Sequence, residues 1–125
     1  MAMTFRWKRD EPPVGTCDAS VLVPDRYLGA FVAKQANRPD MVRWEGTCIV
    51  HDNFDAASVE FYRKMYPGVK ILAHFECTPA LTSVVDYIGG TGDMMKWVDD
   101  HKASSYMLIT ECGLGDLART KFPDK

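Results

Sequence analysis

The chain has 125 residues, of which 46% are hydrophobic, and its formal net charge at pH 7 is −2. These values indicate one domain, or part of a larger one, with enough apolar residues for a core and no basic field for nucleic acid or anionic lipid. No apolar run approaches membrane-spanning length, and residues 1–10 lack the apolar stretch of a signal peptide. We therefore expect no nucleic-acid partner, no membrane segment and a cytoplasmic protein.

The N-terminal third begins without a clear pattern, because prolines and glycines oppose regular structure in the second half of residues 1–20. Val21 to Val23 predicts a short buried strand, and Asp25 can cap the helix that follows. After a turn at residues 37–40, the apolar segment from Met41 to Trp44 predicts the next strand.

The rest of the chain alternates helix and strand signals. Asp55 can cap a helix that reaches Tyr66, and residues 69–73 predict a buried strand. Thr78 followed by Pro79 opens another helix. Its apolar stripe consists of Leu81, Val84, Val85 and Ile88, up to the glycines of segment 89–92. A helix over 93–101, a strand over 106–109 and a short helix over 114–121 complete the prediction.

Short apolar strands that alternate with amphipathic helices predict an α/β fold, a three-layer αβα arrangement with a mainly parallel sheet. We divide the chain into residues 1–20, a poorly patterned segment, residues 21–47, the end of one αβ unit, and residues 48–125, most of the next unit. Because the last predicted helix is not followed by a strand, we expect the sheet to be incomplete.

Two short motifs concentrate the chemistry. Cys48-x-x-His51 follows the second predicted strand and His74-x-x-Cys77 follows the third. Loops at the carboxyl ends of parallel strands share one edge of the sheet, so we expect Cys48, His51, His74 and Glu76 on that edge. The spacing also resembles a Cys2His2 zinc site, although structural zinc pairs usually lie on small knuckles or hairpins.

Two further interpretations stay open from the residues alone. Cys77 precedes a predicted helix, whose dipole lowers a thiol pKa, so it is a candidate nucleophile with His74 nearby. The glycine-rich run at 89–92 suits phosphate or carboxylate binding through its backbone and Thr91. A plain turn between two helices is the alternative for that run, and a buried inert thiol is the alternative for each cysteine.

Taken together, five segments resemble quinolinate synthase, the iron–sulfur enzyme of NAD biosynthesis. They are Val23-Pro24-Asp25-Arg26-Tyr27-Leu28-Gly29, Trp44-Glu45-Gly46-Thr47-Cys48-Ile49-Val50-His51, residues 66–77, Asp86-Tyr87-Ile88-Gly89-Gly90-Thr91, and Thr110-Glu111-Cys112-Gly113-Leu114. The order of these segments and the distances between them in the chain also match the family, so the resemblance extends from about Val21 to the C-terminus.

The resemblance implies a transferase that condenses iminoaspartate with dihydroxyacetone phosphate to quinolinate, with a 4Fe–4S cluster as Lewis acid. It implies three similar units, each of which supplies one cysteine to the cluster. By that resemblance Cys48 is a cluster ligand, and His74, Phe75, Glu76 and Thr91 bind substrate. Glu76 is also the acid–base candidate, with His51 as a polar catalytic neighbour.

The chain departs from the family at two of these positions. The usual proline between His and Glu is Phe75, and the usual serine before Thr91 is Gly90, which removes a hydroxyl. The resemblance assigns no role to Cys17, Cys77 or Cys112. We expect the remaining cluster cysteines outside this chain, together with complementary segments or self-association. The alternatives are a non-catalytic αβ module for a carboxylate or phosphate, or a small zinc-binding domain.

Overall fold

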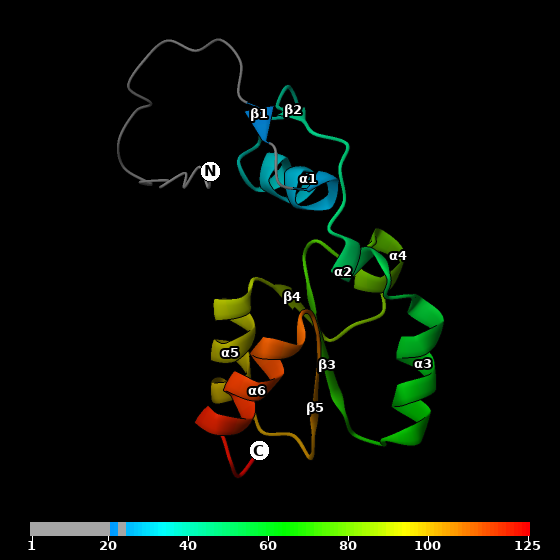
Figure 1. The fold of residues 1–125 in the computed structure, drawn as a ribbon, viewed down its shortest axis with the longest axis vertical. Coiled ribbons are helices and arrows are strands. Elements are labelled where there is room, and N and C mark those ends of the chain that lie inside the picture. The colour runs from blue at the N-terminus through cyan, green and yellow to red at the C-terminus, as the bar shows by residue number, and fades with distance from the viewer. Residues whose placement is uncertain (1–20, 23–24) are drawn as a thin grey trace.

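The computed structural model describes residues 21–22 and 25–125 and shows an α/β fold (Figure 1). In chain order the elements are β1 (Val21–Leu22), α1 (Arg26–Gln35), β2 (Val42–Arg43), α2 (Ile49–Asp52), α3 (Ala56–Met65), β3 (Lys70–His74), α4 (Pro79–Thr82), β4 (Tyr87–Gly89), α5 (Thr91–Asp100), β5 (Tyr106–Ile109) and α6 (Cys112–Lys121). None of these helices is long and apolar enough to cross a membrane.

The central layer is a parallel sheet in the order β4-β3-β5. Its middle strand buries both faces: Ile71, Leu72 and Ala73 are fully inaccessible to solvent. Ile71 and Ala73 pack in one cluster with residues of α3 and α4, whereas Leu72 packs in a second cluster with residues of α5 and α6. Because side chains alternate along a strand, β3 joins two helical layers, as Figure 1 shows, and the predicted αβα arrangement is confirmed.

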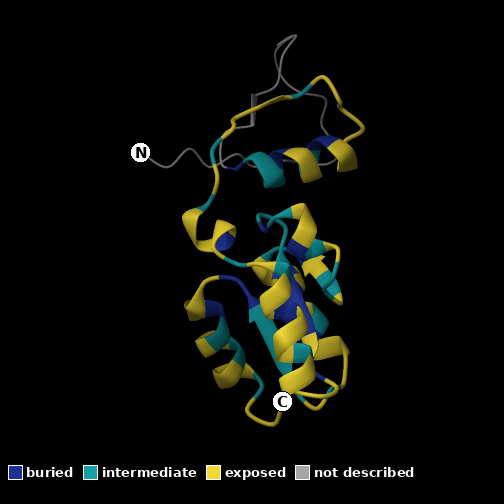
Figure 2. Ribbon diagram, turned by 90° about the vertical axis from the view of Figure 1, so that its right-hand side faces the viewer, coloured by how far each residue is buried: buried dark blue, intermediate teal, exposed yellow. Residues whose placement is uncertain are grey.

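A smaller parallel pair, β1 and β2, lies with α1 beyond the carboxyl end of the central sheet (Figures 1 and 2). The Phe31 ring of α1 stacks on the Phe75 ring at a centroid distance of 5.1 Å. The backbone N–H of Arg26 also donates to the carbonyl of Gly46 over 2.8 Å. These contacts place α1 over the sheet edge on which the candidate site lies.

The predicted helix starts are confirmed by their caps. Asp25 accepts hydrogen bonds from the backbone at the start of α1, Asp55 does so for α3, and Thr78 does so for α4. The strand over Tyr106–Ile109 has the predicted bounds. α5 and α6 each begin two residues before the predicted start, at Thr91 and Cys112.

The helix predicted from Thr78 to Ile88 is wrong beyond its first turn. α4 ends at Thr82, and residues 87–89 form β4, which pairs with β3. The N–H of Asp86 already donates to the carbonyl of Ile71 over 2.8 Å, at the start of that pairing. The helical spacing of the apolar residues was therefore outweighed by pairing with a neighbouring strand, which the β-branched Ile88 favours. Consequently the glycine-rich run connects a strand to a helix, and its interpretation as a helix-to-helix turn is also wrong.

Candidate functional site

The candidate site lies at the edge where the three parallel strands of the central sheet end. His74 is the last residue of β3, with Phe75 and Glu76 next in the chain, and Thr110 directly follows β5. Cys48 is the N-cap of α2, and His51 lies within that helix. The expectation that Cys48, His51, His74 and Glu76 share one sheet edge is confirmed. Parallel strands bring His74 and Glu76 to this side. Cys48 and His51 instead follow β2 of the separate β1–β2 pair and reach the edge on α2.

Three different side chains converge there on a small volume. The Cys48 sulfur, a ring nitrogen of His51 and a carboxylate oxygen of Glu76 all lie within 4.8 Å of one another. The closest approach is 3.0 Å, between His51 Nδ1 and Glu76 Oε2. His51 is buried, while Cys48 and Glu76 are partly exposed, so the cluster opens to solvent on one side.

The His51 ring is held at one nitrogen and left unsatisfied at the other. Nε2 lies 3.1 Å from Thr110 Oγ1, within hydrogen-bonding distance. Nδ1 is buried and has no hydrogen-bond partner among the described residues, because its contact with Glu76 lacks the angle that a hydrogen bond requires. A buried, unpaired polar nitrogen costs free energy unless a ligand or a proton uses it, so Nδ1 marks the reactive side of the ring.

His74 forms a second imidazole layer against His51. Their ring centroids are 4.5 Å apart and the planes differ by 14°. Burial lowers the pKa of His74, and the neighbouring His51 lowers it further, while the Glu76 carboxylate opposes both effects from 3.7 Å. The lowered pKa favours the neutral imidazole, which can donate a proton from one nitrogen and accept one at the other.

Asp25 holds the backbone of Cys48 in place through a hydrogen bond, a role that the sequence did not indicate. Its carboxylate is fully buried, and it accepts hydrogen bonds from the N–H groups of Tyr27 (2.7 Å) and Leu28 (2.9 Å). The second carboxylate oxygen accepts from the N–H of Cys48 at 2.9 Å. The sequence identified Asp25 only as a helix cap, because its bond to Cys48 crosses 23 positions of the chain.

Phe75 and Gly90, the two positions at which we expect a departure from the family, lie against each other. A β-carbon built on Gly90 would sit 3.4 Å from the Phe75 ring, so a side chain there would touch it. Phe75 also packs on the His74 ring. At the start of α5, the Gly90 N–H donates to the Asp93 carboxylate over 3.0 Å, and Thr91 is exposed. Thr91 thus stands at the same sheet edge, after β4.

The other cysteines are not gathered into this cluster. Cys77 is buried in the core between β3 and α4, and its sulfur faces the carbonyl of Ile109 at 3.9 Å. Burial raises its pKa to about 11, so the predicted nucleophilic thiol with a lowered pKa is wrong. Because Cys77 lies in the core and not beside Cys48, His51 and Glu76, the predicted Cys2His2 zinc site is not formed either. Cys112 is exposed at the start of α6, and Cys17 lies outside the described residues.

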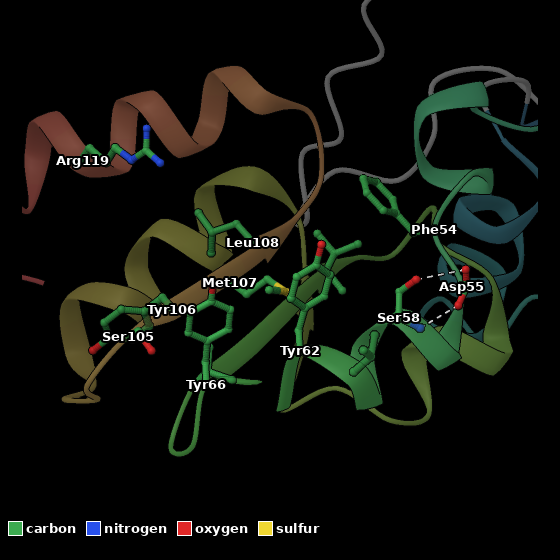
Figure 3. A pocket seen from close by; sticks show the side chains of 13 residues that line it. Phe54, Asp55, Ser58, Tyr62, Tyr66, Ser105, Tyr106, Met107, Leu108 and Arg119 are labelled. Carbon is green, nitrogen blue, oxygen red and sulfur yellow. Dashed lines mark hydrogen bonds between the residues drawn. The ribbon is translucent and has the colours of Figure 1, made fainter. Parts of the chain in front are cut away.

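A large cavity lies elsewhere and contains none of these residues. Its volume is about 540 Å³, and it is bounded by α3, by the outer side of β5 and by Arg119 of α6. Figure 3 shows Tyr62 and Tyr66 facing Tyr106 and Met107 across it. The cavity is therefore apolar along the free edge of the sheet, and it offers none of the chemistry of the Cys48 cluster.

Comparisons with known proteins show the family of this chain. The family model for the quinolinate synthetase A protein matches residues 15–125. Quinolinate synthase 1 of Mesorhizobium japonicum is 34% identical over 104 residues, which are 83% of this chain and 32% of that protein. Quinolinate synthases of Sinorhizobium fredii and Cyanophora paradoxa are 37% and 31% identical, over 78% and 84% of this chain and 27% and 32% of those proteins. The chain spans about a third of these relatives, and it belongs to the quinolinate synthetase A protein family.

Proposed function

We propose that this chain forms about a third of a quinolinate synthase, which condenses iminoaspartate with dihydroxyacetone phosphate and releases two waters and phosphate. The observation that carries the proposal is the convergence of Cys48, His51 and Glu76 within 4.8 Å at the sheet edge, in a chain of this family. His74, Phe75 and Thr91 lie along the same edge and supply a wall for small, anionic substrates.

The donor set fits one corner of a 4Fe–4S cluster. Such clusters are held by cysteine thiolates, and the partly exposed Cys48 offers one beside the buried, unpaired nitrogen of His51. Cys77 cannot contribute without leaving the core, so the other thiolates would come from outside the described residues. When bound, the cluster would supply Lewis-acid polarisation of a substrate hydroxyl or carbonyl oxygen.

The residues of this chain would bind the substrates and move protons. Glu76 is placed to exchange a proton with a bound substrate, since its carboxylate is partly exposed and lies beside two imidazoles. His74, whose lowered pKa favours the neutral form, would donate a hydrogen bond to a substrate oxygen without adding charge. Thr91, at the N-terminus of α5, would bind a phosphate or carboxylate group through its hydroxyl and the helix backbone.

A chimera tests this proposal. Residues 21–125 would replace the matched third of the Mesorhizobium japonicum relative, and iron, sulfide and quinolinate formation would be measured after anaerobic purification. We expect a brown, active protein, loss of the cluster in Cys48→Ser, and retention of the cluster with loss of turnover in Glu76→Gln. The control is Cys112→Ser, which removes an exposed thiol that is not one of the three converging side chains. Full iron content in Cys48→Ser would show that its ligand role is wrong.

A further inference from the structure

We propose that the outer edge of β5 is an interface at which two copies of this chain associate about a two-fold axis. β5 lies at one edge of the sheet, in the order β4-β3-β5, and β3 is its only strand partner among the described residues. The edge of a strand presents N–H and C=O groups that can pair with another strand. The inference concerns the 125-residue chain and does not rest on the proposed synthase function.

The backbone groups that face outward from β5 belong to Tyr106 and Leu108. The N–H of Lys70 in β3 donates to the carbonyl of Ser105 over 3.0 Å, so the backbone of Ser105, and that of Met107 two residues later, faces β3. The direction of hydrogen bonding alternates along a strand, and Tyr106 and Leu108 therefore direct their N–H and C=O groups away from the sheet.

Cavities lie on both faces of the sheet beside this edge. The cavity of about 540 Å³ lies between β5 and α3, where Tyr62 and Tyr66 face Met107 (Figure 3). A second cavity, of about 370 Å³, lies between β5 and α6 and is lined by Tyr106 and Leu108. Side chains of an added strand alternate between the two faces, so both sets would have room. β4, at the other edge, has three residues and ends in glycine, which makes it a poorer partner for a strand.

A second copy of β5 supplies a strand whose register fits this edge. In an antiparallel pair about a two-fold axis perpendicular to the sheet, residues that lie opposite each other point to the same face. Met107 packs on the side of α3, whereas Tyr106 and Leu108 pack on the side of α5 and α6. A register centred on Met107 meets the condition, because it places Tyr106 opposite Leu108 of the second copy. All outward N–H and C=O groups of these two residues then find partners within β5. Antiparallel edge strands on otherwise parallel sheets are common.

The side chains around the larger cavity also favour a strand over a small ligand. Tyr62 and Tyr66 are 39% and 51% exposed beside it. Met107 of the second copy would enter this cavity, where its sulfur would contact the tyrosine rings. A small ligand could cover the rings but would leave the outward backbone groups of β5 unpaired.

The charges on α6 favour the antiparallel orientation of the two copies. Arg119 lines both cavities, and its guanidinium lies 3.7 Å from the Asp116 carboxylate, one turn earlier on the helix. A two-fold axis makes the α6 helices antiparallel, so the cation of each copy would approach the carboxylate of the other. Exposed charges of this kind add little affinity, but they favour one orientation over others.

Sedimentation equilibrium of the reduced chain over a range of concentrations tests the proposal. We expect the mass to rise from the monomer value of 14.1 kDa to twice that value and no further, because a two-fold interface closes on itself. Tyr62→Glu, which places a charge in the cavity, should raise the dissociation constant by about tenfold or more. Phe61→Glu is the matched control, since Phe61 is exposed on the same helix but does not line the cavity, and it should leave the constant unchanged.

Cross-linking tests the register. In a chain that carries Cys17→Ser, Cys48→Ser and Cys112→Ser, Met107→Cys should form an intermolecular disulfide on oxidation with diamide. Opposite residues of a non-hydrogen-bonded antiparallel pair have α-carbons about 4.5 Å apart, within the range of a disulfide. Ile88→Cys, on the β4 edge, is the control and should stay monomeric. Far-ultraviolet circular dichroism should show every variant folded.

A chain that stays monomeric at every concentration would overturn the proposal, as would masses beyond the dimer. Equal effects of Tyr62→Glu and Phe61→Glu, no disulfide in Met107→Cys, or equally fast cross-linking of Ile88→Cys would also overturn it. These measurements involve neither iron nor substrate. A monomeric chain would therefore leave the synthase proposal standing, and an inactive chimera would leave the dimer standing.

Discussion

The carboxylate of Asp25 joins the first turn of α1 to the backbone N–H of Cys48, and the side chain between them is fully buried. One side chain therefore sets both where the helix begins and where the thiol of the candidate site stands. Since α1 carries Phe31, which stacks on Phe75, the same helix also covers the substrate-binding wall that we propose.

We predict that Asp25→Ala disturbs Cys48 as well as the helix. The change removes a cap and leaves the Cys48 N–H without an acceptor, so the free energy of unfolding should fall by about 2–4 kcal/mol. Urea denaturation measures the loss, and the alkylation rate of Cys48 in the folded protein should rise. Asp55→Ala, which removes the exposed cap of α3, is the control and should cost less and leave that rate unchanged. Equal effects of the two variants on Cys48 would contradict the positioning role.

Phe75 and Gly90 should be energetically coupled. Serine is a good N-cap, and Gly90 has a φ of −76°, so Gly90→Ser should stabilise α5 once the aromatic ring is removed. With Phe75 present, the added β-carbon would lie 3.4 Å from the ring, in ordinary van der Waals contact, so the ring would restrict the orientations of the serine hydroxyl and reduce that gain. A double-mutant cycle with Phe75→Ala should give a coupling of about 0.5–1.5 kcal/mol.

Gly92→Ser provides the matched control for this cycle, because a β-carbon there meets nothing within 4 Å. The change that Gly92→Ser causes in the free energy of unfolding should be additive with the change caused by Phe75→Ala. If Gly90→Ser were equally additive, the two departures from the family pattern would be independent substitutions.

Cys77 should resist alkylation in the folded protein. With a pKa of about 11, only about one thiol in a thousand is ionised at pH 8, and the side chain is 1% exposed. Cys112, exposed at the start of α6, should react at least a hundredfold faster with iodoacetamide. Peptide mapping by mass spectrometry after timed quenching separates the two sites. Comparable rates for both thiols would mean that the core around Cys77 opens readily.

Asp86 should make stability depend on pH in the acid range. Burial opposes its ionisation, but hydrogen bonds from the Ile71 N–H, Lys70 and Arg63 outweigh it and lower the pKa of this carboxyl group. A lowered pKa in the folded state means that the stabilisation is complete above the unfolded value of about 3.9 and disappears as the pH falls through the folded value.

Asp86→Asn should therefore cost about 1–2 kcal/mol near pH 7 and progressively less below about pH 4. Urea denaturation at a series of pH values measures this difference. Asp116→Asn removes one partner of an exposed pair with Arg119 and serves as the control, with no appreciable change across the series. A constant loss for Asp86→Asn down to pH 2 would show that its charge does not contribute.

The sequence by itself determined the features that depend on neighbouring residues. Asp25, Asp55 and Thr78 indicate where helices begin, because a cap acts within one helical turn. The apolar runs at β3 and β5 indicate strands, because they are too short for helices. The order of the strands placed His74 and Glu76 at the carboxyl edge of the sheet, and the motifs around Cys48 and His74 identified the family.

Only the tertiary structure decided the features that join distant residues. β4 exists because residues 87–89 pair with β3, which outweighs the helical spacing of Leu81, Val84 and Ile88. Cys77 packs in the core beside Ile109 of β5. Its burial suppresses the reactivity that its position before a helix suggested. The contact of His51 Nε2 with Thr110 Oγ1 joins residues that lie 59 positions apart in the chain. Local signals carry no information about such pairings, because the free energy of each contact is gained only once the strands have assembled.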